Sequence, residues 1–233
     1  MTAYQQDTGK HRGALVGAAV RLVPAAVLIW LILIGVGHLL THQWRGSGLV
    51  RWDKSVDRSL AGHRGATFNT LTHYATFAAE TTTVIAVMVV AIVVLRLASG
   101  GWRASVFLAV TVIGEVTIFV CTTLLVERPR PDVGRLDSAP PTSSFPSGHT
   151  AASVALYASL AVIAFALAAR PWLRALLLAL ALLVPVAVAL SRLYRGMHYP
   201  TDVIAGASLS LVWLAVTSSV LLAGRRPTSK ESP

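Results

Sequence analysis

Residues 104–126 read ASVFLAVTVIGEVTIFVCTTLLV, and residues 127–146, which follow, read ERPRPDVGRLDSAPPTSSFP. The first stretch is long enough to cross a bilayer, since a spanning helix needs about 20 apolar residues. The second holds five prolines, three arginines and three acids, and so many prolines exclude a continuous helix or a paired strand. The change from one to the other indicates a membrane helix that ends in an ordered polar loop.

Apolar runs of this kind recur along the whole chain. We expect spans at about 22–40, 81–97, 104–126, 147–169, 173–190 and 201–222. Of the 233 residues, 55% are hydrophobic and 13% are charged, whereas about 25% of residues are charged in soluble domains. The composition excludes a soluble globule, a coiled coil and a disordered chain, and it predicts an all-α polytopic membrane protein with six transmembrane helices.

The chain divides into one membrane domain and two short tails. Residues 1–12 are polar and are expected to form a disordered cytoplasmic tail, residues 13–222 the six-helix domain, and residues 223–233 a basic cytoplasmic tail. The first apolar stretch is longer than the roughly 7–15 residues of a signal peptide, so we expect it to be retained as a span. Residues 41–66 are polar, with a weak amphipathic pattern.

The formal net charge of +10 does not predict binding to nucleic acid. The arginines and lysines are scattered between apolar runs, which is typical of loops that flank membrane spans rather than of a basic patch. Lys54, Arg58 and Arg195 are expected at the surface or against lipid headgroups.

The number of spans places the polar segments 41–66, 127–146 and 191–200 on one face of the membrane. Basic residues are equally divided between the two faces, but the short turns near 100 and 170 are basic without acids. The positive-inside rule therefore predicts that both termini lie in the cytoplasm and that the three polar segments lie outside the cell.

Pro146-Ser147-Gly148-His149 stands where the proline-rich loop turns into the fourth span. Ser147 suits the N-cap position of a helix, and Gly148 allows a ligand to approach the backbone closely. The free amides of a helix N-terminus form an anion site, for which phosphate is the usual ligand.

Ser191-Arg192 and His198-x-x-x-Asp202 form a second cluster, between the fifth and sixth spans. A carboxylate four residues from a histidine can reach its ring on a helix and hold its tautomer. Arg192, with Arg128 and Arg130 from the loop, offers the forked donors that match a phosphoryl group.

Two histidines, one aspartate and several arginines on one face describe a phosphoryl-transfer site without a metal. His198 would attack phosphorus, His149 would protonate the leaving oxygen, and the arginines would stabilise the equatorial oxygens. The rival chemistry is a metal held by His149, His198 and Asp202, which clustered arginines disfavour.

These motifs resemble those of the type 2 phosphatidic acid phosphatase (PAP2) superfamily, which includes bacterial membrane lipid phosphatases and shares its site with vanadium haloperoxidases. The family pattern is K-x6-R-P, P-S-G-H and S-R-x5-H-x3-D. The second and third elements match in full, but in the first element Thr123 stands at the lysine position before Arg130-Pro131. The resemblance covers about residues 65–222.

The resemblance implies that His198 forms a phosphohistidine, that Asp202 orients it, and that His149 is the general acid and then the base for water. It implies phosphate binding by Arg130, Arg192, Ser147 and Gly148, with Arg128 as a substitute for the missing lysine or else as an interfacial base. The family works without a metal, so no cofactor is implied.

The implied substrate is a membrane lipid phosphate: a polyprenyl diphosphate such as undecaprenyl diphosphate, phosphatidic acid or phosphatidylglycerol phosphate. A bacterial plasma membrane with the site outside favours the polyprenyl diphosphate. A phosphotransferase that uses the same histidine, or a degenerate lipid-binding or transport protein, remains as an alternative. Glu115 lies in mid-span, where an acid is costly and is a functional candidate by default, although a packing role is equally compatible with the sequence.

Overall fold

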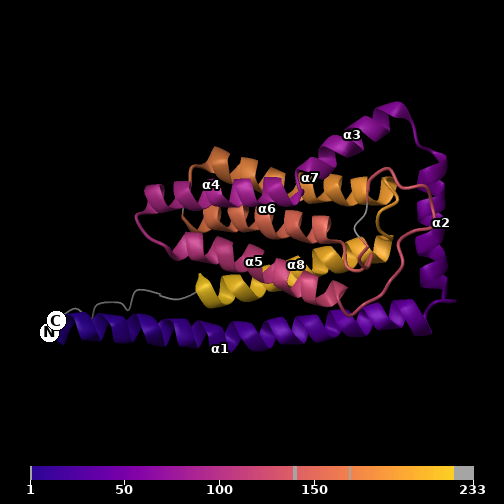
Figure 1. The fold of residues 1–233 in the computed structure, drawn as a ribbon. Coiled ribbons are helices and arrows are strands. Elements are labelled where there is room, and N and C mark those ends of the chain that lie inside the picture. The colour runs from indigo at the N-terminus through magenta and orange to yellow at the C-terminus, as the bar shows by residue number, and fades with distance from the viewer. Residues whose placement is uncertain (1, 139–140, 168, 223–233) are drawn as a thin grey trace.

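The computed structural model describes residues 2–138, 141–167 and 169–222, and this part of the chain contains helices and no strand (Figure 1). The helices in chain order are α1 (Thr2–His38), the π-helical turn η1 (Leu39–Gln43), α2 (Gly48–Gly62), α3 (Ala66–Phe77), α4 (Thr81–Ser99), α5 (Arg103–Thr123), α6 (Gly148–Ala166), α7 (Pro171–Tyr194) and α8 (Pro200–Leu221). Six segments are long and apolar enough to cross a membrane: 16–43 and the helices α4 to α8. The predicted all-α architecture with six spans is confirmed.

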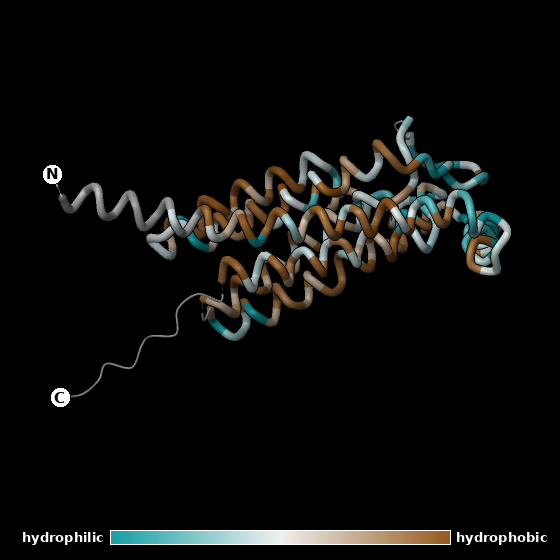
Figure 2. Tube along the Cα trace, turned by 90° about the horizontal axis from the view of Figure 1, so that it is seen from below, coloured by the Kyte–Doolittle hydropathy of each residue, from teal (hydrophilic) through white to brown (hydrophobic). Residues whose placement is uncertain are grey.

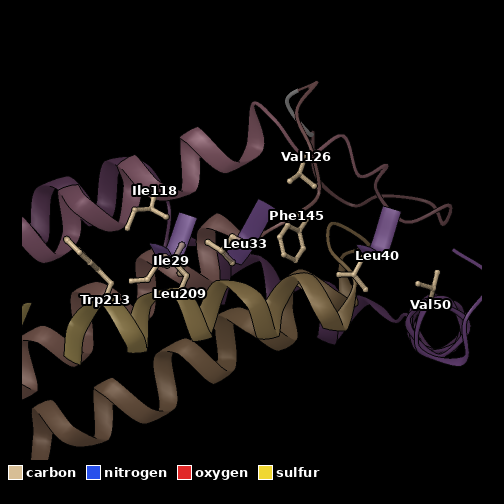
Figure 3. Close-up of a cluster of buried hydrophobic side chains, with 10 residues drawn as sticks. Ile29, Leu33, Leu40, Val50, Ile118, Val126, Phe145, Leu209 and Trp213 are labelled. Atoms are coloured by element: carbon tan, nitrogen blue, oxygen red, sulfur yellow. The ribbon is translucent and has the colours of Figure 1, made fainter. Parts of the chain in front are cut away.

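The spans form a bundle around α6, which packs against α5, α7 and α8. Ile29 and Leu33 of α1 pack with Ile118 of α5 and with Leu209 and Trp213 of α8 in a buried cluster (Figure 3). A second cluster joins α4, α5 and α6. Burial of this kind fixes the positions of the helices whose ends carry the polar motifs.

The loop between α5 and α6 is anchored at both of its ends. Val126 and Phe145 are fully buried and belong to the same cluster as Leu33 and Leu40 (Figure 3). The two ends of the loop also pair with each other, because the amide of Ser144 donates to the carbonyl of Arg128 at 2.9 Å. The loop is therefore held against the bundle despite its polar composition.

Helix α2 runs across one end of the bundle, and α3 leads from it back to α4 and packs against α7 (Figure 1). Hydrophobic residues extend along the bundle, and hydrophilic residues gather at the end with α2 (Figure 2). Within residues 41–66, which have a weak amphipathic pattern, α2 is the helix that forms, and α3 is separated from the predicted span α4 at residues 78–80.

The predicted disorder of residues 1–12 is wrong for residues 2–12, which continue α1 towards the N-terminus. The first proline of the chain is Pro24, so no residue of this stretch removes a helical hydrogen bond. The predicted basic tail 223–233 lies outside the described residues.

Candidate active site

The three polar segments meet at the end of the bundle that carries α2. From α2, Asp53 accepts hydrogen bonds from the amide of Thr201 at 3.0 Å and from its hydroxyl at 2.6 Å. His198 contacts the carbonyl oxygen of Ser144 in the α5–α6 loop. Arg128 of the loop also donates to Asp53, so segments 41–66, 127–146 and 191–200 lie together at one end of the bundle, as the sequence predicts.

A cavity of about 670 Å³ opens at this end of the bundle. Four basic side chains line it, one from the loop and the others from the ends of α6 and α7 and the α7–α8 connection: Arg130, His149, Arg192 and His198. Much of the remaining lining is apolar and comes from α4 and α5, with residues such as Val84, Ile85, Met88, Val112, Ile113 and Val116. The cavity therefore combines a cationic region with an apolar region inside the span.

The ring of His198 is held by a backbone carbonyl. Its Nδ1 lies 2.7 Å from the carbonyl oxygen of Ser144. A carbonyl only accepts hydrogen bonds, so Nδ1 carries the proton and Nε2 keeps its lone pair. Burial, together with the positive charges of Arg192 and Arg130, holds the pKa of His198 well below its usual range. The ring is therefore neutral near pH 7 and can act as a nucleophile.

Asp202 does not bond to His198 as the sequence suggested. Its Oδ2 lies 3.9 Å from Nδ1, beyond the range of a hydrogen bond, and accepts instead from the amide of Tyr199 at 2.9 Å. Its Oδ1 accepts from Arg128. Asp202 thus closes the first turn of α8, and no hydrogen bond joins it to His198.

Arg128 does not face the cavity, and both of its terminal nitrogens donate hydrogen bonds elsewhere. Its guanidinium donates to Asp53 at 2.6 Å, to the hydroxyl of Thr201 at 2.7 Å and to Asp202, and it lies 4.4 Å from the ring centre of Tyr199. It does not line the cavity. This geometry argues against both interpretations from the sequence, the phosphate ligand and the interfacial base. Thr123 contributes no replacement for the family lysine, because its hydroxyl donates to the carbonyl of Val120 in its own helix.

Arg130 and Arg192, for which the sequence predicts phosphate binding, both lie in the cavity wall. Arg130 donates to the carbonyl of Met197 at 2.9 Å, and Arg192 donates to Asp137 at 2.9 Å. The Nε atom of each is buried and has no partner among the described residues. Both side chains therefore retain donors for an anion.

The expectation that Arg195 lies at the surface is wrong, whereas Lys54 and Arg58 are exposed as predicted. Arg195 is buried, and its guanidinium donates hydrogen bonds to the carboxylate of Asp137 at 2.8 and 2.5 Å. Burial alone would raise the pKa of Asp137, but the hydrogen bonds and charges of Arg195 and Arg192 outweigh it, so this pKa lies below its usual range. The ion pairs tie the loop to the end of α7.

The PSGH segment forms the start of α6, with Gly148 and His149 in the cavity wall. A Cβ atom at Gly148 would lie 2.6 Å from the ring of Phe119, so only glycine permits this approach to α5. Ser147 is the N-cap residue but does not line the cavity, since its hydroxyl pairs with that of Thr150 at 3.0 Å and its amide donates to the carbonyl of Asp202. The phosphate role implied for Ser147 is therefore not reflected in its position.

The sequence analysis did not identify the buried acids near the site, such as Asp53, which pairs with Arg128. Val50, Asp53 and Asp57 share the buried face of α2, and this spacing of acids with an apolar residue was an available signal of burial. Asp57 makes no hydrogen bond among the described residues. Burial, with repulsion from Asp53 and Asp202, raises the pKa of Asp57 to about 7.

No three histidine, cysteine, aspartate or glutamate side chains converge as metal ligands would within the part of the chain that the structure describes. His149, His198 and Asp202 in particular do not form such a group, because the carboxylate of Asp202 is directed to Arg128 and Tyr199. What the cavity offers is one neutral imidazole fixed by a carbonyl, a second histidine and two arginines, which is a donor set for an anion.

Comparison with known proteins identifies the family and the fold of this chain. The model of the PAP2 superfamily matches residues 100–226. A crystal structure described as the first transmembrane PAP2 type phosphatidylglycerolphosphate phosphatase from Bacillus subtilis has a similar fold, with a TM-score of 0.70 and 20% sequence identity over 88% of this chain and 98% of that chain. No curated protein matches the sequence. The family match covers Arg130, His149, Arg192 and His198, the four basic residues of the cavity.

Proposed function

Because this chain belongs to the PAP2 superfamily, we propose that it is a metal-independent lipid phosphatase that works through a phosphohistidine on His198. The observation that carries the proposal is the tautomer of His198, with Nδ1 fixed at 2.7 Å from the Ser144 carbonyl and the lone pair left on Nε2. This ring lines a cavity together with His149, Arg130 and Arg192.

In the first step, Nε2 of His198 attacks phosphorus, the bond from phosphorus to the lipid oxygen breaks, and His149 protonates that oxygen. The donors of Arg130, Arg192 and the first turn of α6 stabilise the negative charge on the equatorial oxygens. The carbonyl of Ser144 stabilises the positive charge that the phosphorylated ring acquires on Nδ1–H.

In the second step, His149 takes a proton from water, the water oxygen attacks phosphorus, and the bond from phosphorus to Nε2 breaks. Inorganic phosphate leaves, and His198 regains its neutral form. The depressed pKa of His198 favours this cycle because the free enzyme then holds the nucleophile without a proton on Nε2.

The apolar part of the cavity supports a lipid as substrate. Its α4 and α5 walls lie within membrane spans, and Ile85 and Ile113, both half exposed, stand at the lipid-facing side. A phosphorylated headgroup at the basic end would leave its tails between these helices. The candidates are polyprenyl diphosphate, phosphatidic acid and phosphatidylglycerol phosphate.

We place the protein in a bacterial plasma membrane with the cavity on the extracytoplasmic side. The support is the charge of the two turns at the opposite end of the bundle, where Arg96, Arg103, Arg170 and Arg174 have no acid beside them. Basic turns of this kind stay in the cytoplasm.

The test is release of phosphate from lipid phosphates by purified protein in detergent. We expect His198→Ala to abolish release and His63→Ala, at an exposed histidine outside the cavity, to leave it unchanged. Release that survives in His198→Ala, or that a chelator stops, overturns the proposal. If an added alcohol captures the phosphoryl group in place of water, the protein is a phosphotransferase that uses the same intermediate.

A further inference from the structure

Glu115 is an acid in the middle of α5 that the proposed reaction does not use. It is 1% exposed, and neither carboxyl oxygen has a hydrogen-bond partner among the described residues. It lines the same cavity as His149 and His198. A buried carboxyl without a partner is unfavourable in apolar surroundings, so its position in the cavity wall points to a polar group of the ligand as its partner.

The depth of Glu115 follows from the register of α5 against α6. Phe119 meets Gly148 at the start of α6, which places Phe119 level with the basic end of the cavity. Glu115 precedes Phe119 by four residues, so it lies about 6 Å deeper, at a rise of about 1.5 Å per residue. Ala152, one turn into α6, also lines the cavity.

The phosphate itself is not the partner of this carboxyl. Arg130 and Arg192 define the anion site at the outer end of the cavity, and an acid placed beside a phosphate would repel it. The partner is therefore a polar group of the lipid that lies about one helical turn below its phosphate and above its hydrocarbon tails.

Two lipid classes differ at this depth. The glycerol backbone of a glycerolipid phosphate carries ester or hydroxyl oxygens a few bonds from the phosphate, whereas a polyprenyl phosphate continues there as hydrocarbon. We propose that Glu115 is a specificity-determining residue that hydrogen-bonds the glycerol backbone, so that the substrate is a glycerolipid phosphate. The inference rests on the proposed function and narrows its substrate class.

The kinetic test compares two phosphorylated lipids of similar length, dioctanoylglycerol phosphate and farnesyl phosphate. We expect Glu115→Leu to raise KM for the glycerolipid about tenfold, the effect of one net hydrogen bond, and to leave turnover of farnesyl phosphate unchanged. Glu115→Gln keeps a donor and an acceptor and should retain the glycerolipid preference. Ser159→Ala is the matched control, since Ser159 is also buried without a hydrogen-bond partner among the described residues but does not line the cavity.

A binding test separates this inference from the proposed reaction. Dioctanoylglycerol, which lacks phosphate, should raise the Tm of the wild type and of Glu115→Gln but not of Glu115→Leu, or of Glu115→Met should the leucine variant fail to fold. In the kinetic test, the inference is overturned if Glu115→Leu changes KM equally for dioctanoylglycerol phosphate and farnesyl phosphate, or changes it for neither. Failure of the wild type to release phosphate from any lipid overturns the proposed function, while the binding test still decides the role of Glu115.

Discussion

Arg128 and Arg130 are two residues apart in one loop and have opposite surroundings. Arg128 does not line the cavity. Its guanidinium donates to Asp53, Thr201 and Asp202, and it lies over the ring of Tyr199. Arg130 lies in the cavity wall, contacts backbone carbonyls, and keeps a buried Nε without a partner among the described residues. We call the first region the Arg128 cluster and the second, Arg130 with Arg192, the anion site.

These different surroundings indicate that Arg128 stabilises the structure, whereas Arg130 is available to bind an anion. Two carboxylates compensate the charge of Arg128, so the cluster holds α2 against the start of α8 and has no capacity for a further anion. The charge of Arg130 is not matched by a bonded carboxylate, and its half-buried side chain lines the cavity, so it remains able to pair with an anion there. Variants of the two arginines should therefore affect different properties.

The largest expected effect is on stability, for Arg128→Ala. Removing one member of a buried ion-pair network leaves uncompensated charge and costs about 3–5 kcal/mol, which for a chain of this size corresponds to roughly 6–20 °C in Tm. Thermal unfolding in detergent measures it, with the exposed Arg58→Ala as the control. An unchanged Tm with lost activity would place Arg128 in contact with substrate instead.

Arg130→Ala should affect catalysis and spare stability. Loss of one donor to the equatorial oxygens typically lowers the rate by about 10²–10³, and we expect a fall of that size in kcat/KM with little change in Tm. Arg130→Lys should recover part of it, because a point charge replaces a forked donor. If Arg130→Ala unfolds the protein as Arg128→Ala does, the contrast between the two regions fails.

The sequence predicted the spans and the gathering of the motifs, but not the orientation of the two arginines. Apolar runs and the number of crossings determine which segments share a face. Whether Arg128 or Arg130 faces the cavity depends on the path of a proline-rich loop and on Asp53, 75 residues away, and no local pattern specifies either.

Two further features that the sequence did not predict are the partner of His198 and the burial of Arg195, and both depend on groups far away in the chain. The carbonyl of Ser144 fixes His198, and a carbonyl is present at every residue, so nothing in the sequence distinguishes this one. Arg195 is buried because Asp137 reaches it from a different segment. The motif residues His149, Arg192 and His198 were predictable because their spacing is itself the signal.

Asp202 belongs to the Arg128 cluster and lies close to the nucleophile, so its replacement measures how strongly the two regions are coupled. We expect Asp202→Asn to lower kcat about tenfold, or about 1.4 kcal/mol, because Ser144 holds the tautomer and the asparagine can still accept from the Tyr199 amide. An aspartate that bonds the catalytic histidine directly contributes about 10⁴. A loss of that size would show that Asp202 moves onto His198 during the reaction.

The smallest effect should come from Asp57, at the edge of the Arg128 cluster. Its pKa in the folded protein is raised to about 7, so between its usual range near 4 and pH 7 the folded state binds more protons than the unfolded state. Stability therefore falls as the pH rises through this window, and the loss is complete above it. Asp57→Asn removes the charge that is repelled by Asp53 and Asp202, and it should raise Tm at pH 8 by roughly 2–4 °C, the shift for about 1 kcal/mol in a chain of this size. At pH 5, where Asp57 is already protonated in the folded protein, the increase in Tm should be smaller. An equal increase in Tm at pH 5 and pH 8 would show that the substitution acts through packing rather than through charge.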